Sequence, residues 1–481
     1  MPHVQIESLA TSRSGQILIA GLGGGVLGLI LASKPMFAGL LVGAVLGAIA
    51  VAAALSYPGR VFAVLVLAIA LIPTYAGPGV GPLLLIPGAA LAWMIAAALA
   101  WRNAITRGRI FHPTAIDLAV IAFALLLYVS LSFSAQVTSS DLQNNIFAWG
   151  GPFLAARLLL QDTERPAFVV AASFAIATAI VAPVAVLESL GAENPFSALQ
   201  FNSVEASVWG AAASRLGQVR AEASFGHPIA LSMFVSASAL LSLGMAIYAS
   251  KRKERHAWLA LAALAVGVQA LTFSRTGWLI LVFGVAFLAV TAALRAARRR
   301  LAFVFAAVGV AMVVLMVSGS APKELELFPS SSSSAEGAAF KDSGEYRERL
   351  LERALEPGVL GLWGNPVNKV TPAVSSTNDA TDNAYIILAD EWGLIPTAAL
   401  VAILATLLMA IVLARARGAE ELVILPIAAL TSLCALFFVA FITQQQSVIW
   451  LLVGAGSVAS ERVLVRRRAR TAQRLEPIPE R

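Results

Sequence analysis

The sequence predicts an all-α, polytopic membrane protein with about 12–14 transmembrane helices. Of its 481 residues, 59% are hydrophobic and 13% are charged, and the mean hydropathy is +0.81. Soluble globular domains carry roughly 25% charged residues, so most of this surface is not suited to water. Apolar runs of about 18 residues, the length that spans a bilayer, recur along the chain.

The apolar runs predict about fourteen helical segments. Two of these segments, near residues 153 and 455, are short enough to be half-spanning. The segments are centred near residues 24, 46, 67, 91, 125, 153, 178, 238, 265, 285, 310, 403, 432 and 455.

The basic residues predict the orientation of the chain. If both termini are cytoplasmic, about 24 of the 34 Lys and Arg residues lie on the cytoplasmic side, as the positive-inside rule requires. The outer face is then net acidic, although the sequence pI is about 9.8. The basic pI therefore reports topology, and we expect no nucleic-acid partner.

This threading predicts six regions. Residues 1–190 are N-terminal transmembrane helices, 191–226 an outer loop and 227–318 central transmembrane helices. Residues 319–383 form a long outer, periplasmic loop that contains a short amphipathic helix. Residues 384–465 are C-terminal transmembrane helices, and 466–481 are a basic cytoplasmic tail.

Several other classes of site are excluded. Cys434 is the only cysteine, so no disulfide framework or thiolate metal cage is expected. The glycine-rich stretch 21–25 lies inside an apolar run with no preceding strand, and small residues at this spacing favour close helix packing. His227 is the only histidine on the outer face, so we expect no histidine zinc site and no metal.

Arginines on the outer side break the charge pattern. Arg215 and Arg220 lie just before Phe225-Gly226-His227-Pro228, which opens a helix. Arg275 lies in a tight turn between two apolar helices. Arginine is costly at membrane depth and marks a pathway or an anion site, so these residues are candidates for binding.

A third arginine group lies in the long loop, where residues 345–356 have helical periodicity. Arg349 and Arg353 fall on the charged face, whereas Arg347 falls within the apolar stripe and must snorkel or meet an anion. The predicted stripe consists of Tyr346, Leu350, Leu351, Ala354 and Leu355.

Guanidinium groups at the outer membrane boundary suit a phosphate or pyrophosphate, which they bind in bidentate fashion. A polyisoprenyl-pyrophosphate carrier places its pyrophosphate at that depth. Transfer of a sugar from such a carrier also needs a base for the attacking hydroxyl. Asp382 is a candidate base, and Glu345 is an alternative. Asp382 and Asn383 equally suit a helix cap, and Asp379 with Asp382 would form at most a weak divalent-ion site.

The sequence resembles the O-antigen ligase and O-antigen polymerase superfamily in the order and spacing of four motifs across about residues 215–442. These motifs are Arg220 with Ser224-Phe225-Gly226-His227-Pro228; Thr272-Phe273-Ser274-Arg275-Thr276-Gly277; Tyr346-Arg347; and Asp382-Asn383-Ala384-Tyr385 with Glu391-Trp392-Gly393. The N-terminal half matches only in being polytopic.

The resemblance implies a lipid-sugar-dependent glycosyltransferase in a bacterial inner membrane. It implies transfer from undecaprenyl pyrophosphate on the periplasmic face, with no cofactor. The family's arginines map onto Arg220, Arg275 and Arg347. O-antigen ligases carry a histidine where this chain has Asp382, and this departure favours a polymerase.

We therefore expect a polymerase of undecaprenyl-pyrophosphate-linked oligosaccharide repeat units. The alternatives are a ligase that transfers the glycan to lipid A core or protein, and a lipid-linked oligosaccharide transporter. The expected partners are the lipid-linked donor and acceptor, the bilayer, a chain-length regulator and a flippase. The candidate catalytic residues are Asp382, Arg347 and Arg220, and the candidate substrate-binding residues are Arg215, Arg275, His227, Asn383, Tyr385 and Glu345.

Overall fold

A computed structural model describes residues 49–50, 52–74, 79–80, 83–84, 86–108, 110–134, 136–198, 214–215, 218–293, 349–365, 383–439 and 443–475. The chain divides into two units, Met1–Ser56 and Tyr57–Arg481. In the first unit, residues 49–50 and 52–56 are helical. All elements discussed below belong to the second unit.

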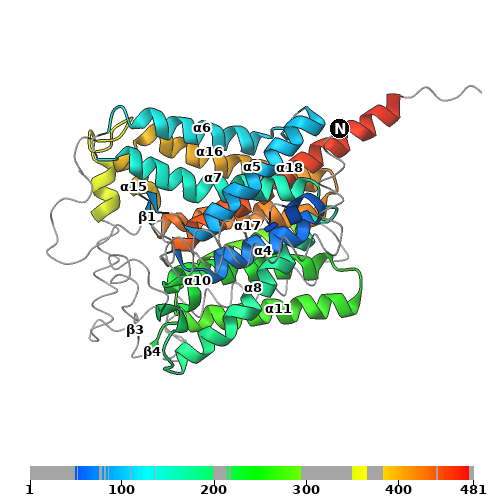
Figure 1. Ribbon diagram of the computed structural model, residues 1–481, viewed down its shortest axis with the longest axis horizontal. Helices are drawn as coiled ribbons and strands as arrows, with labels where there is room; N and C mark the ends of the chain where they lie inside the picture. Colours follow the sequence, from blue (N-terminus) through cyan, green and yellow to red (C-terminus); the bar gives the residue numbers. More distant parts are fainter. Residues whose placement is uncertain are drawn as a thin grey trace, which may run out of the picture. The chain divides into compact units, whose positions relative to one another are not determined.

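Helices dominate the described part of the second unit (Figure 1). With the labels of Figure 1, the first group is α4 (Pro58–Leu71), α5 (Pro87–Arg107), α6 (Ala115–Ser130), α7 (Ser139–Gln161), α8 (Pro166–Ser189) and the 3₁₀ turn η2 (Pro195–Ala198). The central group is η3 (Ala223–Phe225), α10 (Pro228–Tyr248), α11 (Arg252–Leu271) and α12 (Arg275–Ala293). The last group is α15 (Ala384–Glu391), α16 (Leu394–Ala416), η6 (Glu420–Val423), α17 (Ile424–Cys434), η7 (Ala435–Phe437) and α18 (Thr443–Leu475).

The described strands are two-residue pairs. Strand β1 (Gly79–Val80) pairs antiparallel with β2 (Leu83–Leu84), and β3 (Ser214–Arg215) pairs with β4 (Gln218–Val219). Each pair lies within a connection between helices. The fold therefore remains all-α.

Local sequence explains where several helices begin. Prolines stand at the first turn of α4, α5, α8 and α10, where their missing N–H would have no helical partner. Thr114 and Asp117 form a capping box at the start of α6, and Thr138 and Asp141 form another at the start of α7.

The fold confirms an all-α polytopic membrane protein. Six described helices are long and apolar enough to cross a bilayer, and three shorter apolar helices accompany them. The six spans are Pro87–Arg107, Pro166–Ser189, Pro228–Tyr248, Arg275–Ala292, Leu394–Ala416 and Gln444–Val465. Predicted segments near residues 24, 46 and 310 lie outside the described residues, and the other predicted segments coincide with helices.

One predicted length was wrong. The segment near 455 is α18, with 33 residues, and its part Gln444–Val465 is long and apolar enough to cross a bilayer. Polar residues at both ends of α18 shortened the apolar run in the sequence. The segment near 153 is α7, with 23 residues, and it is not among the six spans.

Two ends of the described helices can be named by the arginines that they hold. The Arg220 end holds Arg220, the starts of α10, α12 and α18, and the end of α11. The Arg157 end holds Arg157 in the last turns of α7, together with the start of α6. Helix α10 contacts α8, α11, α12 and α17, and nearly all of its residues are buried.

The amphipathic helix of the long loop is described from residue 349 to 355. Leu350 and Ala354 are buried in a small cluster with Val359 and Ile386. Leu351 and Leu355, which were predicted to share their stripe, are 52% and 74% exposed, so that part of the prediction was wrong. Because this short helix packs against one cluster, only the side chains at i and i+4, Leu350 and Ala354, are buried by it.

Candidate functional site

Arg220 is fixed to the end of a neighbouring helix. Its Nε donates to the carbonyl of Thr272 at 3.0 Å, and the N–H of Ala221 donates to the carbonyl of Leu271 at 3.0 Å. The last carbonyls of a helix have no helical partners, so the Arg220 segment satisfies acceptors at the end of α11. This contact brings Arg220 to the turn that precedes Arg275.

The turn that precedes Arg275 is held by polar side chains. Gln269 Nε2 donates to the carbonyl of Ser274 at 3.0 Å, and Ser232 Oγ donates to Ser274 Oγ at 2.9 Å. Phe273 adopts a φ of 48°, which is uncommon for a bulky residue. Arg275 opens α12, and its Nε and Nη2 atoms are buried. The backbone that carries the Arg275 guanidinium is therefore held in place by the hydrogen bonds of this turn.

His227 lies beside Arg220 and caps α10. Its Nδ1 accepts from the N–H of Ile229 at 3.1 Å. Burial, and secondarily the charge of Arg220, lowers the pKa of His227 to about 4. The imidazole is therefore neutral near pH 7, with its proton on Nε2 as a hydrogen-bond donor.

The backbone between Arg220 and His227 is held by Glu188, near the end of α8. Glu188 Oε2 accepts from the N–H groups of Glu222 at 3.1 Å and Ala223 at 2.7 Å. Ala223 has a φ of 48°, a second non-glycine residue in the left-handed region at this end. Such conformations persist where surrounding contacts enforce them, and they concentrate at functional sites.

The start of α18 reaches the same segment. Gln444 Nε2 donates to the carbonyl of Ser224 at 2.8 Å, and Ser224 Oγ donates to the carbonyl of Ala70. Residues 220–227, which we call the Arg220 loop, are therefore bound through Ser224 to α4 and α18, two helices that are distant in sequence.

The remaining predicted residues are not brought to this loop by any described contact. Asn383 caps α15, with its Oδ1 accepting from the N–H groups of Tyr385 at 3.0 Å and Ile386 at 3.2 Å. Tyr385 donates its hydroxyl to the carbonyl of Leu433 at 3.1 Å and stacks on Phe437. The backbone of Arg215 lies in β3, whereas Glu345, Arg347, Asp379 and Asp382 lie outside the described residues.

The Glu391-Trp392-Gly393 motif has a packing role. Gly393 has a φ of 105°, and a Cβ there would collide with the backbone of Leu362 and Gly364. The N–H of Leu394 donates to the carbonyl of Gly361 at 2.9 Å. Only glycine lets this loop segment lie against the start of α16.

Glu391, which lies outside the six membrane spans, has a pKa that the structure shifts strongly. Burial, followed by the nearby carboxylates of Asp141 and Asp390, raises its pKa to about 7. Asp390 itself accepts from Asn365 Nδ2 at 2.8 Å. A carboxyl group with a pKa near neutrality can act as an acid or a base, but none of the described contacts links Glu391 to Arg220.

We expect Glu391 to make stability depend on pH. The unfolded chain ionises Glu391 near pH 4.5, whereas the folded protein resists ionisation up to about pH 7. The free energy of unfolding should therefore fall by about 1–3 kcal/mol across this interval as pH rises. Melting of wild type and Glu391→Gln in detergent between pH 4.5 and 8 measures the difference.

Glu391→Gln should remove this fall and be the more stable protein at pH 8. Glu352→Gln, at an exposed position in the loop helix, is the control and should follow wild type. Parallel curves for wild type and Glu391→Gln would show that Glu391 has an ordinary pKa.

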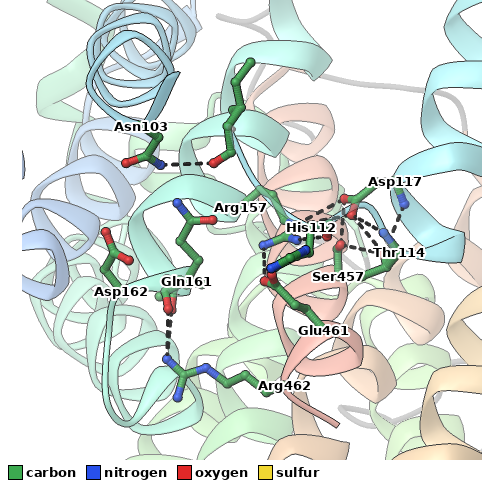
Figure 2. Close-up of polar contacts among 12 residues, drawn as sticks. Asn103, His112, Thr114, Asp117, Arg157, Gln161, Asp162, Ser457, Glu461 and Arg462 are labelled. Carbon is green, nitrogen blue, oxygen red and sulfur yellow. Dashed lines mark hydrogen bonds and ion pairs between the residues drawn. The ribbon is translucent and has the colours of Figure 1, made fainter. Parts of the chain in front are cut away.

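The sequence interpretation missed a buried polar network at the Arg157 end (Figure 2). Arg157 is fully buried; its Nε contacts Asp117 Oδ1 at 3.3 Å, and its Nη1 contacts Glu461 Oε2 at 2.8 Å. Its Nη2 donates to the carbonyl of His112 at 2.8 Å. Ser457 Oγ donates to Asp117 at 2.6 Å, so α6, α7 and α18 are joined by charge-assisted bonds.

A cavity of about 360 Å³ adjoins this network and is lined by Arg107, His112, Gln161, Asp162, Glu461 and Arg462, among others. Arg107 Nη1 contacts Asp162 at 2.9 Å, and Arg462 donates to backbone carbonyls at the end of α7, including that of Gln161 at 3.2 Å (Figure 2). Cations and carboxylates balance here, and the arginines already bind protein groups. The network is best understood as structural.

Within the described ranges, no group of three or more His, Cys, Asp and Glu residues is arranged to hold a metal ion. At the Arg220 end, the described residues offer hydrogen-bonding groups and the charges of Arg220 and Arg275, beside the carboxyl groups of Glu188 and Glu222. A neutral histidine adds one further donor.

The fold and these sites define a multi-pass membrane protein with two arginines, Arg220 and Arg275, at one end of its helices. No protein-family model matches the chain, and no curated protein matches it. Among solved structures, the chain is similar to one from a study of polymerization and crosslinking by a peptidoglycan synthase complex. That match has 20% identity and a TM-score of 0.40, and it covers 73% of this chain and 97% of the other. A similarity this low carries no argument about function.

Proposed function

We propose that the protein is a membrane glycosyltransferase that polymerises undecaprenyl-pyrophosphate-linked oligosaccharide repeat units. The polymer would be an O-antigen, capsule or exopolysaccharide, assembled at the periplasmic face of a bacterial inner membrane. The observation that carries the proposal is the bond from Arg220 to the Thr272 carbonyl. It fixes one guanidinium at the turn from which Arg275 begins α12.

Arg220 and Arg275 both lie at the turn between α11 and α12, and two guanidinium groups there suit a diphosphate. Arginine binds phosphate oxygens in bidentate fashion, and backbone anchoring reduces the entropy lost on binding. Neutral His227 can donate its Nε2 proton to a further oxygen of the same carrier. Arg347 would complete the group from the long loop, as the family resemblance implies.

The proposed transfer is a displacement at the anomeric carbon of the donor sugar. A hydroxyl oxygen of the acceptor glycan bonds to that carbon, while the bond from the carbon to the pyrophosphate oxygen breaks. The hydroxyl proton passes to a base, for which Asp382 is the candidate, and undecaprenyl pyrophosphate leaves as an anion. Preorganised cations lower the barrier because negative charge grows on the leaving group.

Reconstitution of the purified protein in liposomes with an undecaprenyl-pyrophosphate-linked repeat unit tests this proposal. A ladder of products that differ by one repeat unit is the expected result. Single transfer to an added lipid A core or protein acceptor would instead identify a ligase. Movement of the lipid-linked sugar across the bilayer with no new glycosidic bond would identify a transporter.

A further inference from the structure

The start of α18 carries three consecutive glutamines, Gln444, Gln445 and Gln446. Two of them have clear structural partners. Gln444 donates to the carbonyl of Ser224 at 2.8 Å, and Gln446 accepts from Trp149 Nε1 at 2.8 Å. These bonds tie α18 to the Arg220 loop on one side and to α7 on another.

Gln445 differs from both of its neighbours. It is 1% exposed, and its Nε2 and Oε1 atoms are both buried with no hydrogen-bond partner in the part of the chain that the structure describes. A buried amide with neither its donor nor its acceptor satisfied destabilises a protein, and an unsatisfied group in a folded chain calls for an explanation.

The position of Gln445 suggests the explanation. Its neighbour Gln444 contacts Ser224, which lies between Arg220 and His227 in the loop. Gln445 lies in the first turn of α18, the turn from which Gln444 reaches Ser224, so its buried amide lies at the Arg220 end, to which we assign the diphosphate.

We infer that Gln445 binds a hydroxyl group of the sugar next to the pyrophosphate, an inference that rests on the proposed function. A carboxamide offers both a donor and an acceptor, and a sugar hydroxyl can satisfy both. Phosphate oxygens only accept, so they suit the arginines better than Gln445. The diphosphate and the saccharide are then recognised by different side chains.

Gln445→Leu tests this inference because binding and structure give opposite results. Leucine removes an unsatisfied buried amide, so the melting temperature in detergent should stay unchanged or rise. The KM for the lipid-linked repeat unit should rise by about tenfold or more, as expected when a bonded hydroxyl loses its partner. Inhibition by undecaprenyl pyrophosphate, which lacks sugar, should change by less than about twofold.

Ser242→Ala is the matched control. Ser242 is also fully buried with an unsatisfied Oγ, but it lies in the last turns of α10, away from the Arg220 end. Its KM should equal that of wild type. Three results for Gln445→Leu would overturn the inference and leave the proposed function intact. These are an unchanged KM, a lower melting temperature, or a loss of inhibition by undecaprenyl pyrophosphate as large as the rise in KM. A wild-type protein that forms no glycosidic bond would overturn the proposed function, and the inference with it.

Discussion

Arg220→Ala should reduce the rate of polymer formation by at least about 100-fold, with the protein still present at its normal level. Removing one preorganised group that stabilises growing negative charge commonly has an effect of 10²–10³. Arg220 is anchored through Nε to the Thr272 carbonyl, so no other side chain can readily replace it. The ladder formed from the lipid-linked repeat unit by reconstituted protein measures the rate.

Two further variants sharpen the Arg220 experiment. Arg220→Lys keeps the charge but loses the planar fork, so we expect activity well below that of wild type. Arg353→Ala removes an exposed arginine that pairs with Glu356 at 2.6 Å, and it should leave the rate unchanged. Polymer of normal length from Arg220→Ala would refute the assignment of Arg220 to the donor site.

Arg157→Met should lower the free energy of unfolding by about 3–5 kcal/mol. The substitution leaves the carboxylate of Asp117, which is fully buried, without its cation. It also leaves Glu461 and the His112 carbonyl without a donor. The fraction of folded protein recovered in detergent and its melting temperature measure the loss.

A double-variant cycle separates pairing from packing at Arg157. Combining Arg157→Met with Asp117→Asn should cost less than the sum of the two single changes, because the double variant no longer leaves the fully buried carboxylate of Asp117 without its cation. Arg165→Met is the control, since Arg165 is exposed and lies 3.9 Å from Glu421. Additive losses, or a loss for Arg165→Met as large as that for Arg157→Met, would contradict this account of the network.

The helices were largely predictable from sequence because hydrophobic length is a direct physical requirement of the bilayer. Pro228, for example, follows a polar loop and precedes an apolar run, and α10 begins there. Polar residues inside helices made two apolar runs look short. Asp141 and Arg157 shortened the apparent run of α7, and the triple glutamine shortened that of α18.

The candidate site was predictable only in part. Arg220, His227 and Arg275 stand out because positive or polar groups beside apolar helices are costly without a reason. Their association through Thr272 depends on how α10 packs against α11, which no local pattern encodes. Arg157 was missed because its partners Asp117 and Glu461 are 40 and 304 residues away in sequence.

Helices α6, α7 and α18 also share a stack of aromatic rings. Trp149 and Trp450 have ring centroids 5.6 Å apart with planes inclined by 22°, and Phe123 packs against both. Two indoles at this separation can couple their strong far-ultraviolet transitions, which gives a paired circular-dichroism band in that region. The protein thus carries an intrinsic optical probe of the α7–α18 contact, the contact that joins the glutamine-bearing start of α18 to its neighbour.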